Sequence, residues 1–204
     1  MTTLIILTAL AYLLGSISFA VLVSRALRLP DPRTYGSGNP GATNVLRTGK
    51  KIAAALTLLG DGAKGWIAIY LAERYADAGM IDQTMAAAAV GVIVGHMYPL
   101  YFRFRGGKGV ATALGVLLGL NIYLALGSAA TWIIIAAFFR ISSLAALVSA
   151  LFAPFFALIL YNPSHPFFLA VTVFCVMLIV RHRENIRNLI AGKEGRIGGD
   201  PGAT

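Results

Sequence analysis

The stretch Val110–Phe139 reads VATALGVLLGLNIYLALGSAATWIIIAAFF and decides the fold of this chain. It carries no charge, and its roughly 30 residues would extend about 45 Å as one helix, whereas the hydrocarbon core of a bilayer is about 30 Å thick. The stretch therefore forms either one strongly tilted helix or two short ones. A turn between two short helices is expected at Asn121, Gly127 or Ser128, near the far membrane surface.

The composition places the rest of the chain in a membrane as well. Of the 204 residues, 58% are hydrophobic and 12% are charged, which is typical of a protein that crosses a bilayer several times. Further apolar stretches lie at about 4–24, 52–72, 84–102, 144–161 and 166–180. We predict an all-α polytopic membrane protein with a single domain over residues 1–191 and a disordered cytoplasmic tail over residues 192–204.

The distribution of positive charge chooses between one pass and two for residues 110–139. Lysine and arginine accumulate in the cytoplasmic loops of membrane proteins. Two passes give seven transmembrane helices with the N-terminus outside and the C-terminus in the cytoplasm, and they leave Arg74 outside. One pass would move Arg140 and the basic C-terminal segment to the face opposite the first two loops. The cations that two passes place on the cytoplasmic side are Arg25, Arg28, Arg33, Arg47, Lys50, Lys51, Arg103, Arg105, Lys108, Arg140, Arg181, Arg183, Arg187, Lys193 and Arg196.

Three polar loops would then meet on the cytoplasmic face. The first loop, GSGNPGATNVLR, runs from Gly36 to Arg47. Its glycines allow close backbone approach, and its hydroxyl, amide and guanidinium groups suit a phosphate or a carbonyl group. An ordinary turn followed by a helix cap explains the same residues. The loop also matches the G-x-G-x-x-G pattern of dinucleotide-binding folds, but that pattern needs a preceding strand, which this chain does not offer.

The second and third loops carry the remaining polar chemistry. The second, HMYPLYFRFRGGKG over His96–Gly109, offers the glycines and cations that an anion site requires. It is not an ATPase loop, because Gly109 stands where a serine or threonine would follow the lysine. The third, RHRENIR over Arg181–Arg187, gathers an imidazole, a carboxylate, an amide and guanidinium groups. A basic stop sequence after the last helix is the alternative interpretation.

Ionisable groups also lie within or at the end of predicted helices. Asp61 and Lys64 are three residues apart and therefore share a helix face. Lys64 is a secondary candidate for the site, because an intramembrane cation usually faces the bundle interior. A structural ion pair accounts for both residues as well. His96 is either a proton donor or a histidine that packs between helices.

Other function classes are disfavoured. The net charge of +9 could indicate nucleic acid, but basic loops on a membrane protein more often reflect topology and anionic lipid headgroups, so no nucleic-acid partner is expected. The single cysteine, Cys175, lies in an apolar stretch, which excludes a disulfide and a cysteine-based metal site. The H-x-x-x-x-D motif of another large acyltransferase class is absent, so any acyl transfer would need different chemistry.

Together the three loops resemble one family, the bacterial membrane-bound acyl-phosphate:glycerol-3-phosphate acyltransferases of the PlsY type. The matching signatures are Gly36–Asn44 with Arg47, then Gly95–Thr112, then Arg181–Ile186. The resemblance implies a seven-helix enzyme of the bacterial inner membrane with a cytoplasmic active site. Such an enzyme transfers a fatty acyl group from acyl-phosphate to the 1-hydroxyl of glycerol 3-phosphate, giving lysophosphatidate and phosphate. The resemblance further implies no cofactor and no metal, membrane lipid as surroundings, and functional coupling to the enzyme that produces acyl-phosphate.

The resemblance also implies which residues bind the two substrates. Ser37, Arg47 and Lys108 would bind the acyl-phosphate or its leaving phosphate, and the loop Gly106–Gly109 would hold the phosphate of glycerol 3-phosphate. A serine beside Arg140 would close the pocket. The expected substrate-binding residues are Gly38, Asn39, Thr43, Asn44, Arg47, Lys64, Arg105, Gly106, Gly107, Lys108, Gly109, Ser142 and Ser143.

The chemistry itself is expected in the third loop, with His182, Asn185, Glu184 and Ser37 as the catalytic residues that the resemblance implies. His182 and Asn185 would position the attacking hydroxyl, and Glu184 would brace the loop. An acyl-phosphate is a mixed anhydride with a good leaving group, so positioning and charge stabilisation can suffice. Either His182 or the departing phosphate takes the hydroxyl proton. Ser37 has no neighbouring base in sequence, which argues against a covalent role.

Two other functions fit parts of the pattern. A transporter or channel for a phosphorylated metabolite would also use a basic pocket in a helix bundle. However, the polar residues concentrate in loops on one face rather than at the membrane midplane. A small structural membrane protein with basic anchors would leave the glycine-rich loops unexplained.

Overall fold

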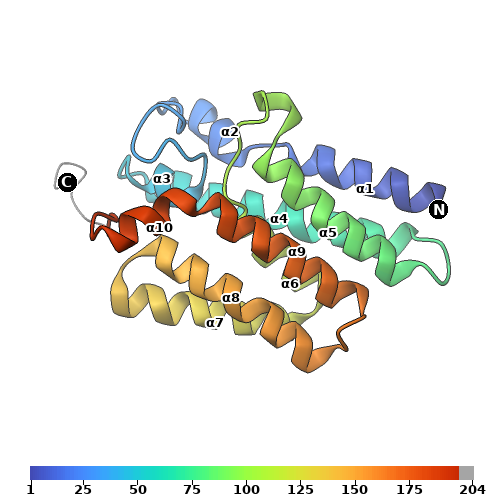
Figure 1. Cartoon of the computed structure of the whole chain (residues 1–204). Coiled ribbons are helices and arrows are strands. Elements are labelled where there is room, and N and C mark those ends of the chain that lie inside the picture. Colours follow the sequence, from blue (N-terminus) through green and yellow to red (C-terminus); the bar gives the residue numbers. More distant parts are fainter. Residues whose placement is uncertain (198–204) are drawn as a thin grey trace.

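The computed structural model describes residues 1–197, and these residues form helices and loops without a strand (Figure 1). The predicted all-α class is confirmed. The elements are α1 (Thr2–Gly15), α2 (Phe19–Ala26), α3 (Ala42–Leu46), α4 (Lys51–Tyr75), α5 (Ile81–Met97), the 3₁₀ helix η1 (Leu100–Phe102), α6 (Val110–Leu120), α7 (Ile122–Phe139), α8 (Ser142–Leu160), α9 (Pro166–Arg181) and α10 (Arg183–Ile190).

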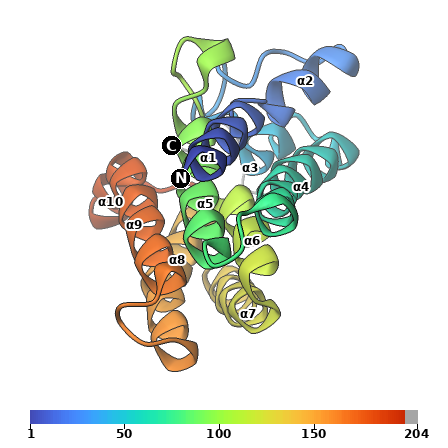
Figure 2. The same ribbon diagram turned by 90° about the vertical axis from the view of Figure 1, so that its right-hand side faces the viewer.

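The long helices pack side by side in one bundle, which Figure 2 shows end-on. Helix α5 contacts α1, α4 and α9, helix α6 contacts α4 and α7, and α8 lies between α7 and α9. Small residues let helix backbones approach closely, as is common in membrane proteins. A Cβ atom on Gly95 would collide with the carbonyl of Tyr12, and one on Gly115 would collide with the carbonyl of Gly62. These glycines therefore allow the tight α1–α5 and α4–α6 pairs.

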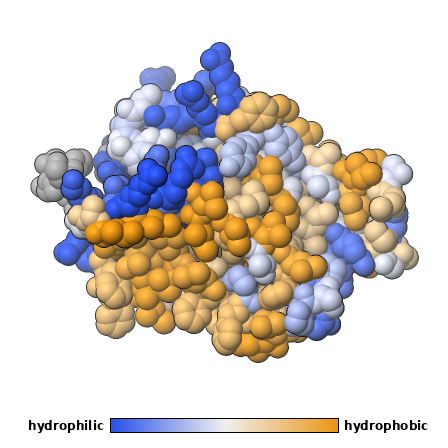
Figure 3. Space-filling model, in the orientation of Figure 1, coloured by the Kyte–Doolittle hydropathy of each residue, from blue (hydrophilic) through white to orange (hydrophobic). Residues whose placement is uncertain are grey.

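Within the described residues, five helical segments are long and apolar enough to cross a membrane, and a pair of helices bent by 57° adds a sixth. These segments are Thr2–Ala26, Lys51–Tyr75, Ile81–Phe102, Ile122–Phe139 and Ser142–Leu160, and the bent pair is Pro166–Arg181 with Arg183–Ile190. Hydrophobic side chains cover the surface over α7, α8 and α9, whereas hydrophilic ones gather along α10 (Figure 3). The chain is a multi-pass membrane protein. The predicted count of seven spans stays a prediction, because α6 has only 11 residues.

The stretch 110–139 forms two helices, as predicted, and the break falls at Asn121. This residue has extended backbone angles, and its side-chain oxygen accepts a hydrogen bond of 2.8 Å from the N–H of Tyr123, which caps α7. The alternative turn positions, Gly127 and Ser128, are wrong. Both lie inside α7, where the Ser128 carbonyl accepts a 2.9 Å hydrogen bond from a serine hydroxyl of α8.

The first apolar stretch, at about 4–24, is not one helix but breaks between α1 and α2. Two side chains pair with the backbone near this break. The ammonium group of Lys64 donates to the carbonyl of Ile17 at 2.7 Å, and the hydroxyl of Ser16 accepts from the N–H of Leu100 at 3.1 Å. A break inside an apolar segment is tolerated where neighbouring helices satisfy the freed backbone groups.

The cation that supports this break is part of a buried ion pair. Lys64 lies 2.8 Å from Asp61, and both side chains are almost fully buried. The ring of His96 lies 3.7 Å from the same carboxylate and 3.1 Å from the hydroxyl of Thr112. Asp61 and Lys64 therefore form a structural ion pair inside the bundle, and His96 packs between helices.

Replacing Asp61 by leucine is expected to lower the free energy of unfolding by about 3 to 5 kcal/mol, because Lys64 would remain buried without its counter-charge. Adding Lys64→Met should restore most of this loss, since no charge is then left unpaired. Chemical unfolding in lipid measures both variants. Asp77→Leu serves as control, because Asp77 forms an exposed pair with the N-terminus and should cost less than about 1 kcal/mol. An unchanged stability of the Asp61 variant would contradict this account.

Some residues of the predicted disordered tail contact the helix bundle. Glu194 accepts hydrogen bonds from two residues of the bundle. The N–H of Ile197 donates to the carbonyl of Arg140 at the end of α7, and the Arg140 guanidinium donates to the carbonyl of Ile197. The segment 193–197 therefore lies against the helix ends. The remainder of the predicted tail, 198–204, is outside the described residues.

Candidate active site

A cavity of about 330 Å³ opens at the end of the bundle where the three polar loops lie. All three loops contribute to its wall. The lining residues are Ser37, Gly38, Asn39, Gly106, Lys108, Arg181, Arg183, Glu184, Asn185 and Asn188. Lysine and arginine outnumber the single carboxylate of Glu184 among them, so the cavity suits an anion.

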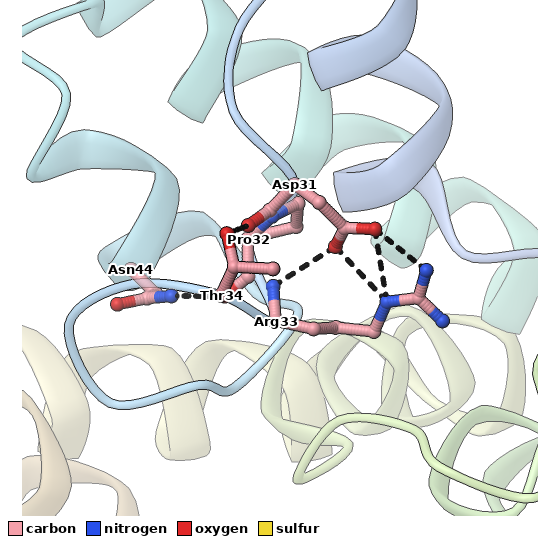
Figure 4. A network of polar contacts seen from close by, with 5 residues as sticks. All are labelled: Asp31, Pro32, Arg33, Thr34 and Asn44. Atoms are coloured by element: carbon pink, nitrogen blue, oxygen red, sulfur yellow. Dashed lines mark hydrogen bonds and ion pairs between the residues drawn. The ribbon is translucent and has the colours of Figure 1, made fainter.

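The first loop is shaped by Asn44, which is buried at the start of α3. The side-chain NH₂ of Asn44 donates to the carbonyls of Pro32 at 2.7 Å and Tyr35 at 3.2 Å, and its oxygen accepts from the N–H of Ser37 at 3.1 Å. Figure 4 shows the bond to Pro32 beside the neighbouring Asp31 cluster. Asn44 therefore holds the loop and is not among the residues that line the cavity, and its expected role in binding substrate stays a prediction.

The turn before this loop is fixed by a separate ion pair. Asp31 accepts from the backbone N–H of Arg33 at 3.0 Å and from its guanidinium at 2.6 Å (Figure 4). The same guanidinium lies over the ring of Phe102, 5.4 Å from its centre. Arg33 therefore connects the first loop to the second.

Several expected binding residues lie outside the cavity wall. Thr43 and Ser142 contact each other through their hydroxyls at 3.2 Å, joining α3 to α8. Arg47 is exposed and lies against Gly36. Arg105 is exposed. The ammonium group of Lys64 lies deep in the bundle, where it is bonded to Ile17 and Asp61. For Lys64 the structure corrects the expectation that it contributes to the site.

The second loop is packed tightly beneath the cavity. A Cβ atom on Gly106 would collide with the carbonyl of His96, and one on Gly107 would collide with the His96 ring. Gly109 has a φ of +89°, which favours glycine, and it precedes the first turn of α6. The close approach to His96 thus explains Gly106 and Gly107, and the positive φ explains Gly109.

The backbone N–H groups of this loop are not all available to a ligand. The N–H of Gly106 donates to the carbonyl of Met97 at 3.2 Å, and that of Gly107 donates to the carbonyl of His96 at 3.1 Å. These two N–H groups are therefore paired with backbone carbonyls, and the binding of a phosphate by the loop Gly106–Gly109 stays a prediction. Lys108 is the side chain through which the loop faces the cavity with positive charge.

Arg181 holds the second loop from the other side. Its guanidinium donates to the carbonyls of Gly106 at 2.9 Å and Gly107 at 3.2 Å and lies over the ring of Tyr98. The sequence alone suggests no role for Arg181 in the site, because an arginine that ends an apolar helix is already explained by membrane topology. Arg183 and Asn188 were not predicted as site residues either, because neither stands out in a basic segment.

A chain of hydrogen bonds links the loops across the site. Lys108 donates to the side-chain oxygen of Asn185 at 2.5 Å, and the NH₂ group of Asn185 donates to Glu194 at 2.6 Å. The hydroxyl of Ser143 donates to the same oxygen of Glu194 at 2.7 Å. Burial lowers the pKa of Lys108, and the nearby carboxylates of Glu194 and Glu184 oppose that effect.

The carboxylate that braces the third loop is thus Glu194 rather than Glu184. Glu184 is exposed at the cavity wall and forms no hydrogen bond or ion pair with the described part of the chain. Glu194 could not be predicted as a site residue, because a glycine-rich segment with no apolar periodicity predicts disorder. A glutamate between a lysine and a glycine carries no further signal.

His182 lies at the junction of α9 and α10 and is only 2% exposed. Its Nδ1 atom is 2.8 Å from the carbonyl of Leu178. Because a carbonyl only accepts, Nδ1 carries the proton of the neutral ring and Nε2 is the acceptor. Burial lowers the pKa of His182 to about 4, and the charge of Lys108 acts in the same direction. His182 is not among the residues that line the cavity.

The titration of His182 is therefore expected below the ordinary histidine range. Its ring should stay neutral, and able to accept a proton, at every pH above about 4. We expect the ¹⁵N NMR shifts of this ring, assigned by comparison with His182→Asn, to be constant from pH 7 to pH 5. A midpoint near pH 6.5 would contradict the burial that the structure shows.

The fold and the site define a class: a multi-pass membrane protein with a basic cavity, suited to an anion, at one end of its helix bundle. The family model described as glycerol-3-phosphate acyltransferase matches residues 5–192. The chain belongs to this glycerol-3-phosphate acyltransferase family, so the resemblance of its three loops is confirmed.

Individual relatives agree over nearly the whole length. The chain is 58% identical to a glycerol-3-phosphate acyltransferase of Ralstonia nicotianae over 195 residues, covering 95% of this chain and 94% of the relative. It is 59% identical to the one of Cupriavidus taiwanensis over 189 residues, covering 92% and 93%. It is also similar to a crystal structure of PlsY (YgiH), an integral membrane glycerol 3-phosphate acyltransferase in its glycerol 3-phosphate form. That match has a TM-score of 0.88 and 37% identity, and it covers 95% of this chain and 94% of the other.

Proposed function

We propose that this protein transfers a fatty acyl group from acyl-phosphate to the 1-hydroxyl of glycerol 3-phosphate, giving lysophosphatidate and phosphate. The observation that carries the proposal is the cavity in which all three polar loops meet beside an apolar helix bundle. Both substrates are phosphate anions, and the acyl chain needs an apolar environment. Similar PlsY structures in glycerol 3-phosphate and lysophosphatidic acid forms support the acceptor and the product.

The cations of the cavity suit the two phosphate groups. Lys108, Arg181 and Arg183 all line the cavity, and Ser37 adds a hydroxyl at its wall. Hydrogen bonds to charged groups are roughly twice as strong as neutral ones, so this set favours phosphate over neutral ligands. We assign Lys108 and Ser37 to the acyl-phosphate and its leaving phosphate, together with Arg47 at the edge of the site.

The third loop supplies the groups that act on the acceptor hydroxyl. In the proposed step, the hydroxyl oxygen bonds to the acyl carbon, the bond from that carbon to the phosphate oxygen breaks, and the phosphate leaves with its electron pair. The hydroxyl proton goes to Nε2 of His182 or to the departing phosphate. Asn185, which Lys108 and Glu194 hold in place, orients the hydroxyl. Ser37 is exposed without a bonded base in the described residues, which argues against covalent catalysis.

We infer seven passes with α6 as a short fourth one, because the chain breaks at Asn121 and α6 and α7 contact each other on either side of the break. The N-terminus is then outside, and the loops with most of the lysine and arginine, including the site, face the cytoplasm of a bacterial inner membrane. Functional coupling to the enzyme that supplies acyl-phosphate follows from the instability of a mixed anhydride and stays a prediction.

Purified protein in lipid should be given glycerol 3-phosphate with acyl-phosphate, acyl-CoA or acyl-carrier protein in separate reactions. We expect lysophosphatidate from acyl-phosphate alone. Product from acyl-CoA or acyl-carrier protein would contradict the proposed donor. Absence of product with every donor, from protein shown to be folded, would discard acyl transfer and favour transport of a phosphorylated metabolite.

A further inference from the structure

Glu194 lies beside the cavity, hydrogen-bonded to Asn185 of its wall, although it comes from the segment 193–197 beyond the last helix. One carboxylate oxygen, Oε1, accepts both the hydroxyl of Ser143 at 2.7 Å and the NH₂ group of Asn185 at 2.6 Å. Lys108 is one hydrogen bond further away, on the other side of the Asn185 amide. The negative charge of Glu194 is therefore next to the cation that faces the cavity.

The groups around this carboxylate are those that a phosphate would use. Hydroxyl, amide and ammonium donors bind a carboxylate oxygen and a phosphate oxygen in the same way. The Arg47 guanidinium lies on the other side of the segment, against Gly195. Ser143 and Asn185 thus bind the Glu194 carboxylate directly, and the cations of Lys108 and Arg47 lie near it.

The segment that carries Glu194 is attached at few points. Beyond the Glu194 contacts, its described residues bond to the bundle at the two ends of the segment. The N–H of Lys193 donates to the carbonyl of Asn188 at 2.8 Å, and Ile197 donates to the carbonyl of Arg140 at 2.6 Å and accepts from its guanidinium at 3.3 Å. The residues on either side, Lys193 and Gly195, are exposed. Few buried contacts mean that local release costs little compared with unfolding a helix.

We propose that Glu194 occupies a phosphate position of the substrate-free enzyme, and that a substrate phosphate displaces its carboxylate from Ser143 and Asn185. The identity of that phosphate as part of glycerol 3-phosphate or acyl-phosphate rests on the proposed function. Displacement has two consequences. The carboxylate weakens phosphate binding by competing for the same donors, and it returns to them when the product phosphate leaves.

Glu194→Gln tests the role of the negative charge. Glutamine keeps an oxygen acceptor for Ser143 and Asn185 but removes the negative charge, so we expect inorganic phosphate to bind about tenfold tighter. Calorimetry of inorganic phosphate binding, and inhibition of turnover by inorganic phosphate, both measure this change. Glu73→Gln is the matched control, because Glu73 is an exposed carboxylate near the far end of α4. Unchanged or weaker phosphate binding by the Glu194 variant would mean that Glu194 only holds Ser143 and Asn185 in place, and it would overturn the proposal.

A second measurement uses the unaltered protein, so it does not depend on the folding of a variant. Displacement of Glu194 should release the segment 193–197 and speed trypsin cleavage after Lys193 and Arg196 when inorganic phosphate or glycerol 3-phosphate is added. Mass spectrometry identifies these cuts, and sodium chloride of equal ionic strength is the control. Slower or unchanged cleavage would overturn the proposal. Calorimetry and trypsin cleavage do not require turnover, so a protein that fails to transfer acyl groups can still confirm or contradict the displacement of Glu194.

Discussion

Replacing His182 by alanine is expected to lower kcat by about 10²- to 10⁴-fold, the range that a positioned general base contributes. The structure gives the physical reason, because the bond from Nδ1 to the Leu178 carbonyl leaves Nε2 as a fixed acceptor. Burial keeps that ring neutral near pH 7. The dissociation constants of both substrates should change by less than threefold, on the order of 0.6 kcal/mol. Steady-state kinetics together with equilibrium binding separates the two effects.

The His182 variant also decides between the two proton acceptors. A fall in kcat of less than tenfold would mean that the departing phosphate takes the hydroxyl proton itself. His182→Asn is the control for packing, because asparagine can keep a donor near Leu178 without supplying a base. Equal losses in both variants, with unchanged thermal stability, would assign the effect to proton transfer rather than to a cavity.

Replacing Gly107 by alanine is expected to lower kcat/KM for glycerol 3-phosphate by about 100-fold or more, the scale of a displacement near 1 Å at a reacting centre. The added Cβ atom would collide with the ring of His96, so the loop must rise and Lys108 must move with it. Gly62→Ala is the control, because a Cβ on Gly62 has its nearest neighbour at 3.6 Å and needs no movement.

A second substitution tests the cause of that loss. His96→Ala removes the ring beneath the loop, so the double variant Gly107→Ala/His96→Ala should recover activity relative to Gly107→Ala alone. The comparison with His96→Ala alone gives the coupling between the two positions. Additive losses would show that the loop does not rest on His96, contrary to the contact in the structure.

Much of the architecture was open to prediction because it follows from local chemistry. Apolar length sets the helices, and the charge pattern correctly divides residues 110–139 into two of them. The break falls at Asn121 rather than at Gly127 or Ser128, because an asparagine side chain can cap the following helix. The three polar loops could be assigned to one site because their residue types agree and positive charge places them on one face.

The roles that the sequence does not reveal in the site are those that depend on tertiary contacts. Asn44 looks like a ligand in sequence, yet all of its hydrogen bonds go to its own loop. Arg181 looks like a topological anchor, yet it holds the carbonyls of the glycine loop. Lys64 pairs with a helix break that no apolar pattern predicts. Glu194 contacts the site from a segment whose composition indicates disorder.

The most direct test of the central claim measures both products in one reaction. Purified protein in lipid is mixed with acyl-phosphate, with and without glycerol 3-phosphate, and released phosphate and lysophosphatidate are determined over time. Acyl transfer predicts one phosphate for each lysophosphatidate, and little phosphate release when glycerol 3-phosphate is left out. Phosphate release that is independent of glycerol 3-phosphate, or lysophosphatidate without matching phosphate, would contradict the account.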